Sequence, residues 1–171
     1  MDPIISLMSL MGMDLPEPEY AVDRLIPEEA ITIVSGTAGS YKSYACLDIA
    51  IAVASGEPAF GQFKTRKTGV LYIDEENGLR LLKKRLIELN AKSNLDIYFR
   101  SYEGFIVNDD SIERLIWDCK TNNIGMVIFD SFVRVNNIDE NKAGDSAAFF
   151  RHIRRIVGEG IAIVLIHHNS D

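Results

Sequence analysis

The octapeptide Gly36-Thr-Ala-Gly-Ser-Tyr-Lys-Ser43 is the segment that most constrains the fold. It follows a short β-branched run at residues 30–35, which predicts a buried strand, and it precedes an apolar helix at residues 44–55. A strand, a glycine-containing loop, Lys-Ser and a helix, in that order, are typical of a phosphate-binding loop. In such a loop, backbone N–H groups point at a phosphate. The order therefore predicts a nucleotide site within an α/β sheet.

The residues of this loop have distinct expected roles. Lys42 would reach the β- and γ-phosphates, and Ser43 would offer its hydroxyl to Mg²⁺. Tyr41 stands where the usual pattern has a second glycine, and a positive φ there would cost about 1–2 kcal/mol. The motif alone leaves open an ordinary glycine-containing turn before a buried helix. If the loop binds a nucleotide, the contacts come from Gly36, Thr37, Ala38, Gly39, Ser40, Tyr41, Lys42, Ser43 and Tyr44.

The rest of the chain alternates strands with helices. Apolar runs predict strands at residues 70–74, 96–100, 125–130 and 161–166, and periodic segments predict helices at residues 79–90, 110–119 and 145–157. Asp110 or Ser111 is the expected N-cap of the helix at residues 110–119. Strands that alternate with helices predict an α/β fold, with a parallel sheet of about five strands and helices on both faces.

Carboxylates follow two of the predicted strands. Asp130 ends an apolar strand and fits a residue that orders Mg²⁺, although carboxylates are common at strand ends without a metal. Glu75 and Glu76 follow the strand at residues 70–74, where a carboxylate can align an attacking water with a γ-phosphate. The alternative is an acidic turn that caps the next helix. Strand alternation does not decide which of the two glutamates faces the site.

His167 and His168 follow the strand at residues 161–166, at the same expected edge of the sheet. A histidine beside a γ-phosphate can donate a hydrogen bond and sense whether that phosphate is present. Surface imidazoles and a metal site are the alternatives, and a metal site needs more ligands than the pattern obviously supplies. Cys46 and Cys119 have no metal-ligand spacing and suit buried thiols in a reduced, cytoplasmic protein.

The charge and the N-terminal sequence limit the partners. A net charge of −7 and a pI near 5.0 argue against holding nucleic acid by bulk charge alone, though not against a local basic groove. Residues 1–13 are apolar, too short to span a membrane, and lack the basic start of a signal peptide. We expect them to form a short helix that packs on the domain or on a neighbour. A proline-containing linker follows at residues 15–19.

The ordered segments GTAGSYKS, VLYIDEEN, MVIFDS and IVLIHHNSD resemble those of RecA-like P-loop ATPases of the RepA type, the plasmid hexameric helicases with their AAA-domain relatives. The resemblance covers residues 25–171 and implies ATP and Mg²⁺ as ligands. It implies Lys42 and Ser43 as the phosphate and magnesium residues and Asp130 as the Walker B acid. The resemblance also implies the sheet order 3-2-4-5-1, with the strands numbered along the chain. It implies that ATP is hydrolysed at the subunit interfaces of a ring, and such rings often act on DNA.

The same resemblance assigns the catalytic residue to Glu76, with Glu75 as the fallback. It matches His167 and His168 to a histidine pair, of which we favour His168 as the phosphate sensor. The family's sheet continues past the strand of the phosphate loop, and its arginine finger lies beyond residue 171. We therefore expect a sheet without its C-terminal strands here and a longer natural protein. An edge strand left open predicts a homo-oligomer, or coverage by residues 4–13.

These expectations divide the chain into an N-terminal segment and linker, residues 1–24, and a RecA-like ATPase domain, residues 25–171. The expected function is ATP hydrolysis in a DNA replication, repair or helicase-like assembly. The expected partners are other copies of the chain and DNA, without a membrane. The open alternatives are a nucleotide-binding sensor with little hydrolysis, a RecA-like regulator without a motor role, and a small-molecule kinase.

Overall fold

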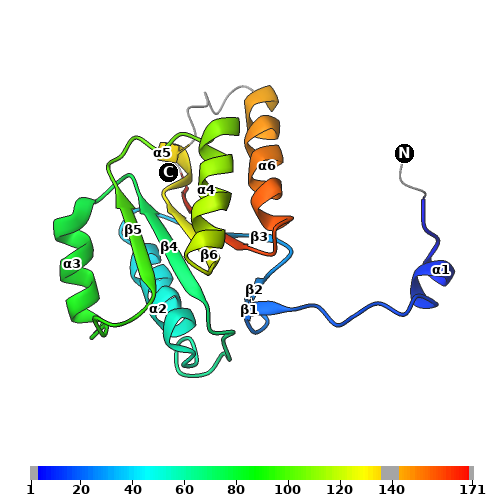
Figure 1. The fold of residues 1–171 in the computed structure, drawn as a ribbon, viewed down its shortest axis with the longest axis horizontal. Helices are drawn as coiled ribbons and strands as arrows, with labels where there is room; N and C mark the ends of the chain where they lie inside the picture. The colour runs from blue at the N-terminus through cyan, green and yellow to red at the C-terminus, as the bar shows by residue number, and fades with distance from the viewer. Residues whose placement is uncertain (1–3, 136–142, 170–171) are drawn as a thin grey trace.

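The computed structural model describes residues 4–135 and 143–169, which contain a five-stranded parallel sheet (Figure 1). The strand order is β3-β7-β6-β4-β5. When these five strands are numbered 1 to 5 along the chain and the sheet is read from β5, this is the predicted order 3-2-4-5-1. Because all pairs are parallel, the carboxyl ends of the strands meet at one edge. The predicted α/β fold is confirmed. The strands are β3 (Ile31–Gly36), β4 (Gly69–Asp74), β5 (Ile97–Ser101), β6 (Ile124–Asp130) and β7 (Ala162–His168).

Helices cover both faces of this sheet. α2 (Lys42–Ser55) and α3 (Gly78–Glu88) pack on one face, and α4 (Asp109–Thr121) and α6 (Ala143–Val157) pack on the other (Figure 1). Alternate residues of β4 enter the two hydrophobic clusters: Val70 and Tyr72 enter one, and Leu71 and Ile73 enter the other. β4 is buried on both faces, which explains why its sequence is a continuous apolar run.

β3 differs from the expectation of a buried strand. It lies at the edge of the sheet and pairs only with β7, and the side chain of Ile33 is 53% exposed. The prediction of burial was wrong because β-branched composition indicates a strand without indicating its position in the sheet. The edge position itself follows from the order of the described strands.

The helix ends show how local hydrogen bonds set the boundaries. α2 is followed by Gly56 in the left-handed conformation (φ 81°), as the sequence predicts. α4 begins after Asn108, so the expected N-cap at Asp110 or Ser111 was wrong. The Asn108 side chain accepts from the Ser111 N–H (2.9 Å), and Ser111 Oγ accepts from the Asn108 N–H (2.9 Å). A further short helix, α5 (Phe132–Val135), was not predicted.

The N-terminal region differs from the expected division at residue 25. β1 (Tyr20–Val22) and β2 (Ile26–Pro27) form a small antiparallel sheet, and Ala21 and Val22 are buried in the core. The packed body therefore begins at β1. α1 (Leu7–Met11) is the expected short helix, but residues 4–19 are exposed and α1 stands clear of the body (Figure 1). The segment therefore neither packs on its own domain nor covers the edge of β3, and the alternative expectation, that it packs on a neighbour, stays a prediction.

The cysteines and the helix lengths bear on the remaining expectations. Cys46 and Cys119 are buried and free, as predicted, and burial raises the pKa of each thiol to about 12. Within residues 4–135 and 143–169, no helix combines the length and the apolar character needed to cross a membrane.

Candidate functional site

The phosphate loop joins β3 to α2 at the carboxyl edge of the sheet. Lys42 begins α2, and its Nζ donates hydrogen bonds to the carbonyl oxygens of Gly36 (2.8 Å) and Thr37 (2.7 Å). The Lys42 side chain is buried, so its ammonium group lies inside the curve of the loop. The first N–H groups of a helix lack partners within the helix and carry its positive dipole end. This geometry suits a bound phosphate group.

Tyr41 takes the backbone conformation that the usual glycine would take. Its φ is 60° and its ψ is 20°, in the left-handed region, which costs tyrosine about 1–2 kcal/mol. The side chain is 74% exposed, and its ring lies beside that of Tyr44, with centroids 5.7 Å apart. Because most of the ring faces solvent, the tyrosine is compatible with a phosphate inside the loop.

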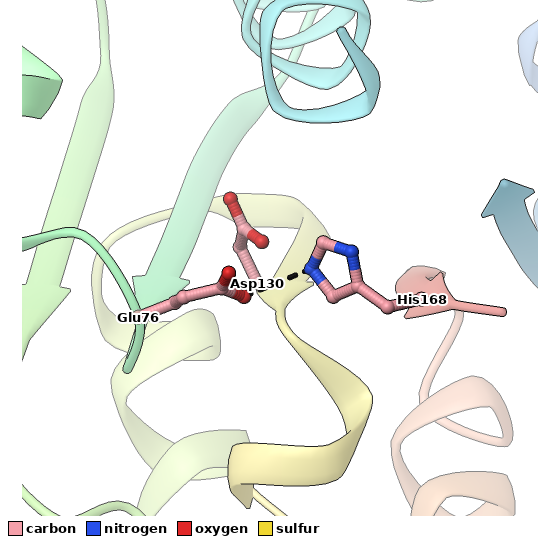
Figure 2. Close-up of side chains that lie close together, drawn as sticks. All are labelled: Glu76, Asp130 and His168. Atoms are coloured by element: carbon pink, nitrogen blue, oxygen red, sulfur yellow. Dashed lines mark hydrogen bonds and ion pairs between the residues drawn. The ribbon is translucent and has the colours of Figure 1, made fainter. Parts of the chain in front are cut away.

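Glu76, Asp130 and His168 lie together at the same edge and point toward one another (Figure 2). Glu76 follows β4, Asp130 ends β6 and His168 ends β7. One ligand atom of each lies within 4.8 Å of the others, and Nε2 of His168 is 3.0 Å from Oε2 of Glu76. The parallel register explains the cluster, because Asp130 pairs with Asp74 at the end of β4, and His168 pairs with Gly36 at the start of the loop.

Asp130 is completely buried, and this burial raises the pKa of its carboxyl group. The hydroxyls of Ser43 and Tyr72 counteract part of that rise. Tyr72 donates to Oδ2 of Asp130 (2.8 Å), whereas Oδ1 has no hydrogen-bond partner among the described residues. A buried carboxylate oxygen without a partner, beside a serine hydroxyl, fits a hard divalent cation such as Mg²⁺.

Glu75 and His167 lie away from this cluster. The Glu75 carboxylate accepts hydrogen bonds from the N–H groups of Gly104 (3.1 Å) and Phe105 (3.0 Å), so it holds the loop that follows β5. His167 faces the opposite side of β7 from His168, and its ring centroid is 5.7 Å from that of Phe132 in α5. The structure therefore places Glu76 and His168 at the cluster, and Glu75 and His167 away from it.

A cavity of about 310 Å³ joins the phosphate loop to Glu76 and His168, whereas Asp130 is buried behind its lining. Its lining includes most of the predicted loop residues, together with two residues of the connection between β4 and α3, one residue of α3 and the last residue of β7. The lining residues are Ala38, Gly39, Ser40, Tyr41, Lys42, Ser43, Tyr44, Glu76, Asn77, Arg85 and His168.

Arg85 is a site residue that the sequence analysis missed. Its guanidinium group lies 5.3 Å from the centroid of the Tyr44 ring, and Nη2 donates to Oδ1 of Asn77 (3.4 Å). Nε and Nη1 are buried without a partner among the described residues. Arg85 lies three residues after the buried Leu82, on the flank of the apolar face of α3, but it follows Lys83 and Lys84 in a basic stretch that suggests a solvent-exposed cation. Only the fold brings it to the cavity.

A comparison with protein-family models is informative once this geometry is known. The model described as the AAA domain matches residues 6–170, nearly the whole chain. The chain belongs to the AAA domain family. This membership agrees with the phosphate loop and the parallel sheet. AAA domains generally bind and hydrolyse ATP, so the membership implies that the chain binds a nucleotide. No curated protein matches this AAA domain.

Proposed function

We propose that this AAA domain binds and hydrolyses ATP, with Mg²⁺, in the cavity beside the phosphate loop. The observation that carries the proposal is the convergence of Glu76, Asp130 and His168 at the edge where Lys42 lies. Phosphoryl transfer to water needs a phosphate cradle, a place for a divalent cation and a group that orients the nucleophile. The residues around this cavity supply a candidate for each.

The phosphates would be held by the loop from Gly36 to Ser43 and by the N-terminus of α2. Lys42 would exchange its hydrogen bonds to the loop carbonyl oxygens for bonds to the β- and γ-phosphates. Ser43 and Asp130 would hold Mg²⁺, which neutralises charge on the phosphate oxygens when it is bound. A cation there would also favour the ionised form of Asp130, against the effect of burial.

Glu76 is the residue that we propose orients the attacking water. Its side chain is partly exposed, so water can reach the carboxylate from the cavity. His168 lies between Glu76 and the phosphate loop, and its imidazole can donate a hydrogen bond to either the glutamate or a γ-phosphate. Arg85 adds guanidinium donors at the same cavity, which can contact an additional phosphate oxygen.

A nucleotide-dependent sensor with little hydrolysis is a second candidate function. The hydrogen bond between Glu76 and His168 supports it, because a glutamate held by a histidine is less available to a water molecule. The resemblance to RepA-type helicases supports the first candidate, within a homo-oligomeric assembly that acts in DNA replication or repair. Turnover that rises on addition of single-stranded DNA would favour that assembly over the sensor.

Calorimetric titration with Mg-ATP and Mg-ADP, followed by turnover assays, tests the proposal. We expect saturable binding by the wild type and its loss in Lys42→Ala, because that change removes the charge inside the loop. We expect Glu76→Gln to bind both nucleotides but to lower turnover by about 10²–10⁴-fold, the usual range for a group that assists proton transfer.

Glu75→Gln is the matched control for the catalytic assignment. It makes the same chemical change one residue away, in a side chain that holds the loop at Gly104 and Phe105. We expect it to retain most of the turnover. Wild-type turnover by Glu76→Gln would reject the role of Glu76. Absence of binding to either nucleotide by the wild type would reject the proposed function as a whole.

A further inference from the structure

The cluster of Glu76, Asp130 and His168 has the ligand atoms of a zinc site. It combines one imidazole with two carboxylate groups, and one ligand atom of each residue lies within 4.8 Å of the others. Mg²⁺ takes oxygen ligands, whereas Zn²⁺ binds histidine nitrogen together with carboxylate oxygen. The imidazole therefore distinguishes this cluster from the magnesium position proposed for Ser43 and Asp130.

The separations within the cluster are close to those that a tetrahedral zinc ion needs. With metal–ligand bonds of about 2.0–2.2 Å, two ligand atoms of such an ion lie about 3.4 Å apart. Nε2 of His168 is 3.0 Å from Oε2 of Glu76, so this pair needs only a small adjustment. The two side chains are 31% and 33% exposed and point toward Asp130 (Figure 2), so they can move toward it without disturbing the core.

Asp130 carries the buried oxygen that points to a bound cation. Its side chain is completely buried, and Oδ2 accepts a hydrogen bond from the Tyr72 hydroxyl (2.8 Å). Oδ1 has no hydrogen-bond partner among the described residues, and a buried polar atom without a partner is unfavourable. A divalent cation supplies that partner and favours the charged form of the carboxyl group.

Other groups that could ligate zinc are less suited. Cys46 and Cys119 are buried, and burial raises the pKa of both thiols, whereas zinc binds the thiolate. Nδ1 of His152 lies 3.5 Å from Oδ1 of Asp109, but the same oxygen accepts a hydrogen bond from Arg155 (2.6 Å). A guanidinium group at that oxygen repels a second cation. The cluster at the edge of the sheet is therefore the favoured position.

We propose that Glu76, Asp130 and His168 bind Zn²⁺ in the nucleotide-free protein. The side chains supply three ligands, and water from the cavity beside Glu76 and His168 supplies the fourth. The bound ion engages the carboxylate that we propose orients the attacking water, and it occupies the carboxylate proposed to hold Mg²⁺. Zinc then inhibits ATP hydrolysis, a consequence that rests on the proposed function.

Calorimetric titration of the nucleotide-free 171-residue chain with Zn²⁺ tests the site directly. We expect the wild type to bind a single equivalent, and His168→Asn to bind about tenfold more weakly or worse, because the change removes the nitrogen ligand. His167→Asn makes the same change on the opposite side of β7, beside Phe132, and should bind like the wild type. No binding by the wild type, or equal binding by His168→Asn, would overturn the proposal.

Cobalt substitution reports the ligands in the unaltered chain. The visible absorption of Co²⁺ is intense for a tetrahedral ion and weak for the octahedral ion in water, so it reports the coordination geometry. We expect an intense band with the wild type, its loss on addition of Zn²⁺, and an unchanged band in His152→Asn. Loss of the band in His152→Asn would move the site to the contact between α4 and α6 and overturn the proposal. A spectrum like that of Co²⁺ in water would also overturn it.

Inhibition by zinc tests the consequence for hydrolysis. Turnover with Mg-ATP is measured while a metal buffer raises the concentration of free Zn²⁺. We expect turnover to fall as zinc saturates the site, and His168→Asn to need about tenfold more zinc for the same effect. Full turnover at saturating zinc would overturn the inhibitory role. Absence of turnover without zinc would instead reject the proposed function, and the titration without nucleotide would still decide the zinc site.

Discussion

Asp130 combines complete burial with the proposed role of holding Mg²⁺, for which its carboxyl group must be charged. Burial raises the pKa of this group, so its ionisation lowers the free energy of unfolding. The hydroxyls of Tyr72 and Ser43 stabilise the charged form and offset only part of this effect. A folded-state pKa above the unfolded value means that stability falls as the pH rises from the unfolded pKa through the folded one. If Asp130 has the proposed role, its carboxylate is kept at the expense of stability.

Asp130→Asn should therefore stabilise the protein without nucleotide. We expect no gain at a pH below the ordinary pKa of aspartate and a gain of about 1–3 kcal/mol near neutral pH, where the wild type buries a charged oxygen without a partner. Thermal unfolding between about pH 3 and pH 8 measures the difference. The same variant should lose Mg²⁺-dependent turnover. A stability difference that does not change with pH would contradict the assigned cause.

Arg85 is expected to distinguish ATP from ADP. If its free guanidinium donors contact the γ-phosphate, Arg85→Met should weaken Mg-ATP binding by about tenfold or more, as expected for a lost charge-assisted hydrogen bond, and Mg-ADP binding by much less. Competition titrations measure the ratio. Arg80→Met, an exposed position on the same helix, is the control. Equal losses for both nucleotides would place Arg85 away from the γ-phosphate.

The connection between β4 and α3 is the element that orients Glu76. The Asp74 carboxylate accepts hydrogen bonds from the N–H groups of Glu76 (2.9 Å) and Asn77 (2.8 Å). The Tyr102 hydroxyl donates to the Glu76 carbonyl oxygen (2.5 Å), and the Tyr102 ring packs over Gly78. These bonds turn the chain at the end of β4, so the direction of Glu76 depends on the turn and not on the alternation of the strand.

Gly78→Ala tests this element. Gly78 has a φ of 74°, and a Cβ there would lie 2.6 Å from Cε2 of Tyr102. We expect a loss of about 1–3 kcal/mol from the backbone strain and the contact, and a larger loss of turnover than of nucleotide affinity because Glu76 moves. Gly160→Ala is the control, since its φ is also 74° but no atom lies within 4 Å of the added Cβ. Unchanged turnover in Gly78→Ala would contradict the positioning role.

The sheet order organises the molecule as a whole. Because β3, β7, β6 and β4 lie side by side with their carboxyl ends together, segments far apart in the chain reach one cavity. The same order leaves β3 and β5 as the edges of the sheet, with the exposed α1 and the helix α3 on different sides of the body (Figure 1).

Removal of residues 1–19 should leave the body of the domain intact. All described residues in this range are exposed, so we expect the free energy of unfolding to change by less than about 0.5 kcal/mol. Ile26→Ala, at a buried position of β2, should cost about 2–5 kcal/mol by comparison. Denaturant unfolding measures both. A large loss on truncation would mean that the segment packs on its own domain.

Local sequence determined the five strands of the parallel sheet, the helices that alternate with them and the position of the phosphate loop, but it did not predict β1, β2 or α5. Apolar runs bounded by polar turns specify β4, β6 and β7 because a strand buried on both faces tolerates few polar residues. The acids and histidines at the ends of these strands could be predicted to lie near one another, because the carboxyl ends of parallel strands share one edge of the sheet.

Only the tertiary structure decided which side chains reach the cavity. The direction of Glu76 rather than Glu75 depends on two hydrogen bonds of its backbone, one donated to the Asp74 carboxylate and one accepted from the Tyr102 hydroxyl. Tyr102 lies on a loop distant in sequence. Arg85 reaches the cavity because the fold places it against Tyr44 on α2. The exposure of Ile33 and of α1 depends on which strands pair and where the linker leaves the body. Local periodicity reports whether a residue can be buried, whereas long-range pairing decides what it faces.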